Sequence, residues 1–192
     1  MSHYLETDYF YCNHISESDL IDIKNFIVDE PRGYGLVRYL QNEALKDEKS
    51  NNARTYIVRD KKDNMIVGYY SLKAGFMADN ERRLFLGKRI FDSIPGVELA
   101  NFAVNGEYKR MNPDYKGLGK IIFSKFVIPT VHQGQEHLGL SILYIFSLPY
   151  ENLIRNYEKM NFSRLAKFQE KSMHKRIRPY YDTDCIFMYQ RI

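Results

Sequence analysis

The stretch Glu98–Lys125, ELANFAVNGEYKRMNPDYKGLGKIIFSK, decides the fold, because it joins an apolar strand, a basic loop and the start of a helix. The loop closes in Gly117-Leu118-Gly119, where the helix begins. The first N–H groups of a helix have no acceptor within it and lie at the positive end of its dipole. Residues 116–120 therefore predict a binding site for a phosphate or pyrophosphate group.

The residues around the glycines strengthen this prediction. Lys116 and Lys120 flank the turn and supply positive charge. Small residues suit such a turn because the backbone must approach the phosphates closely. A Gly-x-Gly sequence also occurs in plain strand-to-helix connections, and that interpretation remains the alternative.

Composition indicates one globular domain over residues 1–192, because 44% of the residues are hydrophobic and 27% are charged. No apolar run is long enough to span a bilayer, and the first residues lack the layout of a signal peptide. Cys12 and Cys185 lack a Cys-x-x-Cys spacing. We therefore expect a cytoplasmic protein with reduced thiols and no membrane partner; a disulfide is the less favoured alternative.

Apolar periodicity and turn residues predict the other elements. Strands are expected over residues 3–13, 55–58, 66–72, 97–104, 140–146, 163–168 and 184–190. Helices are expected from a capping box at Ser16 and Asp19 to about Glu30, then over 36–47, over 118–128 and over 151–160. Pro129 should kink or stop the third of these helices. Residues 77–95 fit an inserted loop with a short helix. The order β-α-α-β-β-β-α-β-α-β-β predicts an α/β (α+β) fold, with a mixed sheet flanked by helices.

Several kinds of site are not expected. His132 and His137 are five residues apart, which places them on different faces of a helix, so no metal site is predicted. The dinucleotide fingerprint, the GxxxxGK[ST] loop and the serine nucleophile elbow are all absent from the sequence. The anion-binding turn is therefore the main candidate for chemistry.

The loop Asn112–Lys120 resembles the pyrophosphate loop of the GNAT superfamily of acyl-CoA-dependent N-acyltransferases, whose pattern is Arg/Gln-x-x-Gly-x-Gly/Ala at a strand–helix junction. Phe102-Ala103-Val104 resembles the end of the family's fourth strand, and Leu153–Phe162 resembles its Tyr-Glu-Lys-x-Gly-Phe helix and turn. The resemblance covers most of residues 54–165. It implies a single-domain, mostly antiparallel GNAT-like sheet.

The resemblance also implies roles for individual residues. Acetyl-CoA would be the co-substrate, bound without a metal by Phe102, Ala103, Val104, Lys116, Gly117, Leu118, Gly119, Lys120 and Asn152. An amine would attack the thioester directly, with Tyr157 as the acid that protonates the departing thiolate. Glu98 would be the base, and its apolar neighbours would raise its pKa. Tyr157 as a core-packing residue and Glu98 as an exposed strand end are the structural alternatives.

Two positions and the length of one connection depart from the family pattern. Asp114 stands where the family has Arg or Gln, so the loop's positive charge would come from Lys116, Lys120 and either Lys109 or Arg110. The connection from Val104 to the glycines is longer than usual. Asn161 replaces a glycine, and asparagine tolerates the left-handed conformation that such a helix end requires.

The acceptor stays open between a small amine, a protein or peptide amine, and aminoacyl-tRNA, as in the toxin branch of the same superfamily. The segment 164–178 carries six cations, which favour either an anionic partner such as RNA or a solvated helix face. A non-catalytic acyl-CoA-binding or regulatory module is the alternative function. The C-terminal strand predicts either a homodimer contact or the last strand of the sheet.

Overall fold

The computed structural model describes residues 3–30, 32–78, 83–85, 88–90, 93–175 and 184–192. The chain forms two compact units. The first unit comprises Met1–Lys73 with Leu99–Thr130, and the second comprises Ala74–Glu98 with Val131–Ile192.

Hydrogen bonds join eight strands in the order β1-β2-β3-β4-β7-β8-β10-β9. These strands are β1 (Leu5–Glu6), β2 (Phe10–His14), β3 (Arg54–Asp60), β4 (Ile66–Ala78), β7 (Ser93–Val104), β8 (Ile142–Ser147), β9 (Ser163–Arg164) and β10 (Ile186–Arg191). β7 and β8 pair in parallel, whereas β1–β2, β2–β3, β3–β4, β8–β10 and β9–β10 are antiparallel. The predicted mixed, mostly antiparallel sheet is confirmed.

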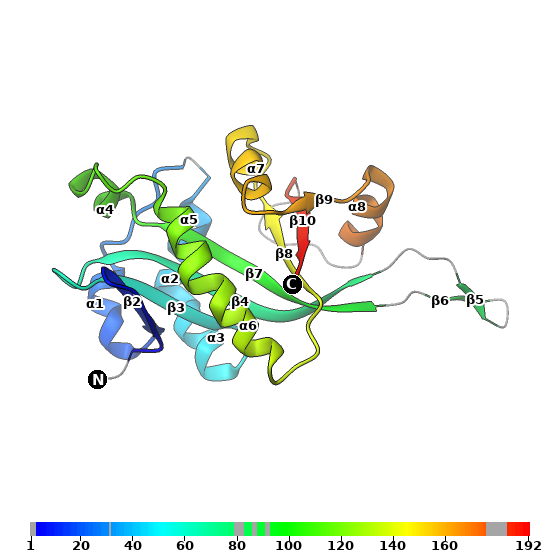
Figure 1. Cartoon of the computed structure of the whole chain (residues 1–192), viewed down its shortest axis with the longest axis horizontal. Helices are drawn as coiled ribbons and strands as arrows, with labels where there is room; N and C mark the ends of the chain where they lie inside the picture. The colour runs from blue at the N-terminus through cyan, green and yellow to red at the C-terminus, as the bar shows by residue number, and fades with distance from the viewer. Residues whose placement is uncertain (1–2, 31, 79–82, 86–87, 91–92, 176–183) are drawn as a thin grey trace. The chain divides into compact units, whose positions relative to one another are not determined.

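Helices cover both faces of the sheet in the first unit (Figure 1). The helical elements here are η1 (Glu17–Asp19), α1 (Leu20–Ile23), α2 (Tyr34–Asn42), α3 (Ala44–Ser50), α4 (Gly106–Met111), α5 (Leu118–Ile122), the π-helix η2 (Phe123–Val127) and the first turn of α6 (Ile128–Gln135), which passes into the second unit after Thr130. Two adjacent tyrosines of β4 show the alternation of a strand. Tyr69 donates to the Leu36 carbonyl of α2 at 2.7 Å, whereas the Tyr70 hydroxyl lies 2.8 Å from that of Thr130 in α6.

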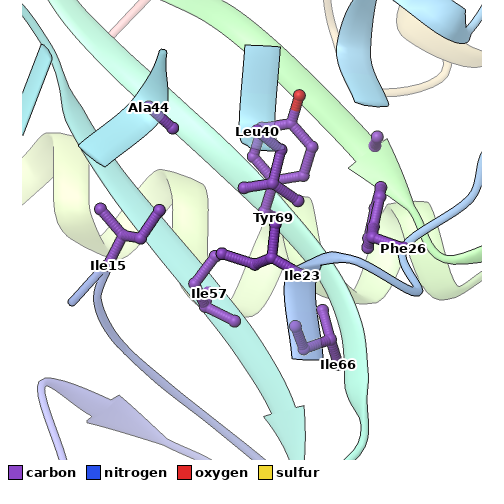
Figure 2. Close-up of a cluster of buried hydrophobic side chains, with 9 residues drawn as sticks. Ile15, Ile23, Phe26, Leu40, Ala44, Ile57, Ile66 and Tyr69 are labelled. Carbon is purple, nitrogen blue, oxygen red and sulfur yellow. The ribbon is translucent and has the colours of Figure 1, made fainter. Parts of the chain in front are cut away.

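The core between the sheet and the first helices is a cluster of buried aliphatic and aromatic side chains (Figure 2). Ile23, Leu40 and Ala44 come from the helical side and meet Ile57 of β3 and Tyr69 of β4. All five are almost completely inaccessible to solvent. This packing fixes β3 and β4, and the chain continues from β4 into the second unit.

The predictions for the first unit need three corrections. The expected strand over residues 3–13 is two short strands, β1 and β2, which pair with each other. The first helix ends at Ile23, because a turn after it brings both Ile23 and Phe26 into the core. The helix expected over 36–47 divides at Glu43, and Asn51 in the left-handed conformation ends the second part. The capping box is confirmed, since the Ser16 N–H donates to the Asp19 carboxylate at 2.8 Å.

Residues 77–95 differ from the predicted loop with a short helix. β4 extends to Ala78, β7 begins at Ser93, and between them β5 (Arg83–Phe85) pairs antiparallel with β6 (Lys88–Ile90). Residues 79–82, 86–87 and 91–92 of the predicted loop lie outside the described residues. The described part of the insertion is therefore strand rather than helix.

Pro129 does not stop the helix that follows the glycine turn, which was one of the two effects predicted for it. Proline is tolerated in the first turn of a helix because its missing N–H would have no partner there. Here the helix widens into the π-helix η2, and α6 begins at Ile128, so Pro129 falls in a first turn. The helical path continues to Gln135.

In the second unit, α7 (Glu151–Glu158) and α8 (Lys167–His174) accompany β8, β9 and β10. The strand expected over 163–168 is limited to Ser163–Arg164, because α8 starts at Lys167 to bury Met173. Met173 joins a core cluster with Met77, Ala78, Ile142, Tyr144 and Phe187. β10 pairs with β8 on one side and β9 on the other, so the C-terminal strand belongs to the sheet but lies inside it, and β9 forms the edge.

Three general features accompany this fold. Cys12 and Cys185 are buried, and neither forms a disulfide. Within the described residues, no three His, Cys, Asp or Glu side chains gather as metal ligands. No helix in this part of the chain has both the length and the apolar character needed to cross a membrane.

Candidate functional site

The exit from β7 is fixed by Asn105, a buried residue that caps α4. Its backbone N–H donates to the Val67 carbonyl at 2.8 Å, and its side-chain amide donates to the Ile66 carbonyl at 2.8 Å. Its side-chain oxygen accepts the Glu107 N–H at 3.1 Å, as an N-cap residue does. These bonds tie the end of β7 to β4 before the chain enters the predicted loop.

The helix α4 is anchored by Tyr108, which is completely buried. Its hydroxyl donates a hydrogen bond to the Asp60 carboxylate at the end of β3. Burial and this carboxylate raise the pKa of Tyr108 well above its ordinary value, so the phenol remains a donor. Its backbone carbonyl accepts the Asn112 N–H at 3.0 Å, which positions the first residue of the loop.

An aromatic cluster supports the middle of the loop. The Tyr115 ring lies 5.7 Å from the Phe10 ring and 6.4 Å from both Tyr9 and Tyr108, measured between ring centroids. Such distances are typical of favourable edge and tilted aromatic contacts. Tyr115 still exposes 37% of its surface, so its other side is accessible to a ligand.

The loop closes at Gly117, which has the left-handed backbone conformation with φ 72° and ψ 28°. Only glycine adopts this conformation without a steric cost, which explains the residue at this position. The Ile121 N–H donates to the Gly117 carbonyl at 3.0 Å and begins the helix. The N–H groups of the first helical turn, from Leu118 to Lys120, have no acceptor within the helix.

A hollow of about 210 Å³ lies beside this turn. Its lining residues are Val104, Lys109, Tyr115, Gly117, Leu118 and Gly119. A Cβ atom added to Gly119 would lie 3.8 Å from Val104 and 4.0 Å from Phe102, so glycine keeps the space next to the strand end open. The predicted strand residues 102–104 and the glycine turn are therefore side by side.

The positive charge of the loop comes from fewer residues than predicted. Arg110 pairs with Asp29 at 2.7 Å, and Lys109 lies 3.4 Å from the same carboxylate. Lys116 and Lys120 are exposed, and no carboxylate among the described residues forms an ion pair with either. Asp114 is also exposed. Lys116 and Lys120 are therefore the cations available to an anion at the turn.

The remaining predicted residues belong to the second unit. Tyr157 lies in α7 and exposes only 8% of its surface. Burial alone raises the pKa of its phenol well above the ordinary value, so the group stays protonated at neutral pH. Asn161 has φ 69°, which confirms the left-handed conformation expected there. After this turn, the Phe162 N–H donates a hydrogen bond to the Tyr157 carbonyl at 3.0 Å.

Glu98 and Asn152 complete the predicted set. Glu98 lies opposite Tyr144 in the parallel register of β7 and β8 and is partly buried. Burial, and secondarily the negative charge of Glu98, raise the pKa of Tyr144. Asn152 is exposed in the first turn of α7. The first unit thus groups residues 102–104 with 116–120, whereas Glu98, Asn152 and Tyr157 lie in the second.

Sequence reasoning missed the residues that hold the loop in place. Asn105, Tyr108 and Asp60 have no role in the predicted site. Asn105 followed by Gly106 and Glu107 is an N-cap signal that could have indicated α4. The pairing of Tyr108 with Asp60 spans 48 residues and leaves no local signal in the sequence.

No protein-family model matches the chain. Solved structures of bacterial toxins do match it over nearly their whole length. An AtaT toxin mutant bound to the C-terminus of the antitoxin AtaR and acetyl-CoA is 14% identical, with a TM-score of 0.67 over 96% of this chain and 94% of that one. A KacT mutant is 16% identical, with a TM-score of 0.68 over 96% and 95% of the two chains. AtaT complexed with acetyl-methionyl-tRNAfMet is 15% identical, with a TM-score of 0.61 over 93% of both.

At these identities the comparison defines the fold alone. The fold that the sequence predicted, that of the GNAT N-acyltransferases, is confirmed.

Proposed function

We propose that this protein is an acetyl-CoA-dependent N-acetyltransferase whose acceptor is the amino group of an aminoacyl-tRNA. The observation that carries the proposal is the turn at Gly117. A left-handed glycine heads a helix next to a strand end, with Lys116 and Lys120 exposed beside it. Backbone N–H groups and a helix N-terminus in this arrangement suit the pyrophosphate of coenzyme A.

The comparisons support the choice of cofactor and acceptor. A structure with the same fold contains acetyl-CoA, and another contains acetyl-methionyl-tRNAfMet. Together with the glycine turn, these complexes favour acetyl-CoA over other phosphorylated ligands. A small amine and a peptide amine remain the competing acceptors, and the assay below separates them from tRNA.

The reaction proposed is a direct transfer. The neutral amine attacks the thioester carbon, a C–N bond forms, and the C–S bond breaks to leave the thiolate of coenzyme A. A base takes one proton from the amine, and an acid gives one to the thiolate, so the products are an amide and a free thiol. Glu98 is the proposed base and Tyr157 the proposed acid. A backbone N–H near residues 102–104 is the proposed donor to the thioester oxygen.

Tyr157 is protonated at neutral pH, as the proposed acid must be, although burial raises its pKa and so makes it a weaker proton donor. A phenol that stays protonated at neutral pH can donate its proton but cannot serve as the base. Glu98 is the complementary group, because a carboxylate accepts a proton. This division assigns each proton transfer to a different side chain.

Calorimetric titration with acetyl-CoA, followed by a thiol-release assay with an acceptor panel, tests the proposal. We expect binding, and thiol release with aminoacyl-tRNA but not with deacylated tRNA. Release only with a small amine or a peptide amine would overturn the tRNA acceptor while keeping the acetyltransferase. Binding without release on any acceptor would favour the non-catalytic acyl-CoA-binding module, which Asp114 motivates. Absence of binding would remove both functions.

A further inference from the structure

The helix α8 has two contrasting sides. Met173 is completely buried in the core of the second unit, and Glu170 is turned toward the sheet, where it accepts the Phe187 N–H of β10 at 3.0 Å. Lys167, Lys171 and Lys175 follow one another at intervals of four residues and are exposed. Residues four apart lie on the same side of a helix, so the three ammonium groups form one row.

This row differs from several other lysines of the described residues in its lack of counter-charges. Lys46, Lys49 and Lys61 are each within 3.4 Å of a carboxylate, namely those of Glu43, Glu17 and Glu6. In contrast, the described residues provide no ion pair for Lys167, Lys171 or Lys175. Glu170, the acidic residue of α8, lies 3.8 Å from Arg164 instead. Within the described part of the chain, the row therefore presents positive charge to solvent without an ion-pair partner.

An aromatic side chain lies within the same surface. Phe168 is 70% exposed, although phenylalanine normally buries most of its area. It is three residues from Lys171, so the two side chains are neighbours on the helix. Single-stranded nucleic acids are recognised by two kinds of side chain together. Cations neutralise the phosphates, and aromatic rings provide surfaces on which the bases stack.

We propose that Lys167, Phe168, Lys171 and Lys175, termed here the α8 face, form an RNA-binding surface. The lysines contact the phosphates, and the ring of Phe168 stacks on an unpaired base such as those at the 3′ end of a tRNA. The proposal rests on the proposed aminoacyl-tRNA acceptor and specifies a part of the protein that holds it. An acidic protein segment is the competing partner. It would form ion pairs with the lysines, but it has no base to stack on the ring of Phe168.

Fluorescence anisotropy with a labelled 12-nucleotide single-stranded RNA and with deacylated tRNA tests the α8 face. The test variant is the triple substitution Lys167→Gln, Lys171→Gln and Lys175→Gln. Each phosphate contact in a single strand contributes about 0.7 to the slope of log affinity against log salt. We therefore expect the triple variant to lower this slope by about two and to weaken binding at low salt by more than about tenfold.

The chain offers a charge-matched control in the triple substitution Lys46→Gln, Lys49→Gln and Lys61→Gln. Both triple variants change the formal net charge by −3, from +4 to +1. We expect the control to bind RNA almost as the unmodified protein does. An equal loss in both variants, or no loss in the α8 variant, would overturn the proposal. Circular dichroism and acetyl-CoA titration verify that each variant is folded.

The aromatic part is tested by Phe168→Ala and Phe168→Tyr. Base stacking predicts that the alanine variant weakens RNA binding by roughly 5- to 100-fold with an unchanged salt slope, whereas the tyrosine variant retains it. Unchanged RNA affinity in Phe168→Ala, or equally tight binding of polyglutamate by the unmodified protein, would contradict RNA recognition here.

Thiol release separates the proposed RNA-binding surface from the proposed acetyltransferase activity. Release with aminoacyl-tRNA that is unaffected in the α8 variant keeps the acetyltransferase and overturns the surface. If RNA binding depends on the α8 face but no thiol is released with any acceptor, the RNA-binding surface is kept and the acetyltransferase is overturned.

Discussion

The hydroxyl group of Tyr108 donates to the carboxylate of Asp60, and this bond joins the helix before the glycine turn to the end of β3. Asp60 is itself held, since its other oxygen accepts the Lys62 N–H at 2.8 Å. Both side chains are buried. The loop that we assign to the pyrophosphate is therefore anchored through a residue outside it.

Replacing Tyr108 with phenylalanine should leave the buried Asp60 carboxylate without its side-chain donor. An unsatisfied buried group costs about 1–3 kcal/mol, so the free energy of unfolding should fall by about that amount in urea titrations. Tyr9→Phe is the matched control, because Tyr9 is 62% exposed, and it should change stability little. Equal stability of Tyr108→Phe and the unmodified protein would show that the bond contributes nothing.

The protein should lose stability steeply in alkali. Burial raises the pKa of Tyr56, Tyr108, Tyr144 and Tyr157, and raises the pKa of the Cys12 thiol to about 11. Groups whose pKa is higher in the folded state stabilise it fully below their unfolded pKa and progressively less above it. The unfolded cysteine thiol has a pKa of about 8.5 and unfolded tyrosine a pKa of about 10, so denaturant midpoints should be flat near neutrality, begin to fall above about pH 8.5 and fall more steeply above about pH 10. A midpoint that is constant from pH 8 to 11 would contradict this prediction.

Alanine substitutions at the two glycines of the turn should have opposite effects on stability. Gly117→Ala places a side chain at φ 72°, which costs about 1–2 kcal/mol although the space around it is open. Gly119→Ala lies in the helix and should stabilise it by up to about 1 kcal/mol. The added methyl group should nevertheless weaken acetyl-CoA binding, because it faces the hollow beside Val104. Thermal unfolding and calorimetry measure the two effects, and a stabilised Gly117→Ala would be inconsistent with the left-handed turn.

Tyr157→Phe tests the proposed acid. Loss of general acid catalysis costs about 10²- to 10⁴-fold in turnover, and acetyl-CoA affinity should stay nearly the same. Because burial raises the pKa of Tyr157, turnover of the unmodified enzyme should show no alkaline loss from this phenol below pH 10. Tyr189→Phe in β10 serves as the control and should retain full turnover. Full activity of Tyr157→Phe would leave the residue a packing role against Phe162, whose ring lies 5.6 Å away.

Glu98→Gln tests the proposed base. The amide cannot accept the proton of the ammonium group, so turnover should fall and its dependence on pH at the acidic side should disappear. Acetyl-CoA affinity should persist, because Glu98 is outside the glycine turn. Glu158→Gln, an exposed position in α7, provides the control. A pH–rate profile identical to that of the unmodified protein would remove Glu98 from the mechanism.

Local features were predictable where one residue type has a distinct backbone preference. The left-handed positions of Gly117 and Asn161 follow from sterics, and the hairpin of β3 and β4 follows from strand residues around a polar turn. The parallel contact of β7 with β8 and the bond between Tyr108 and Asp60 depend on distant segments. Their energies are decided by packing, which a local pattern does not encode.

The errors also have physical causes. The apolar residues over 163–168 suggested a strand, but Phe168 faces solvent and only Leu165 packs against the core. Met173, beyond that range, is the buried residue of α8. Gly106 was counted as part of a loop, although Asn105 caps a helix that begins with it. A cap residue can outweigh the poor helix propensity of glycine at the first position.

The burial of Cys12 and Cys185 has a practical consequence for future experiments. A thiol reacts with maleimides and nitroxide reagents as its thiolate; burial limits access to both thiols, and it also raises the pKa of the Cys12 thiol, which supplies almost no thiolate at neutral pH. The unmodified chain should thus give a low labelling background. One cysteine introduced on the surface would then carry a fluorophore or spin label, without first removing the native pair.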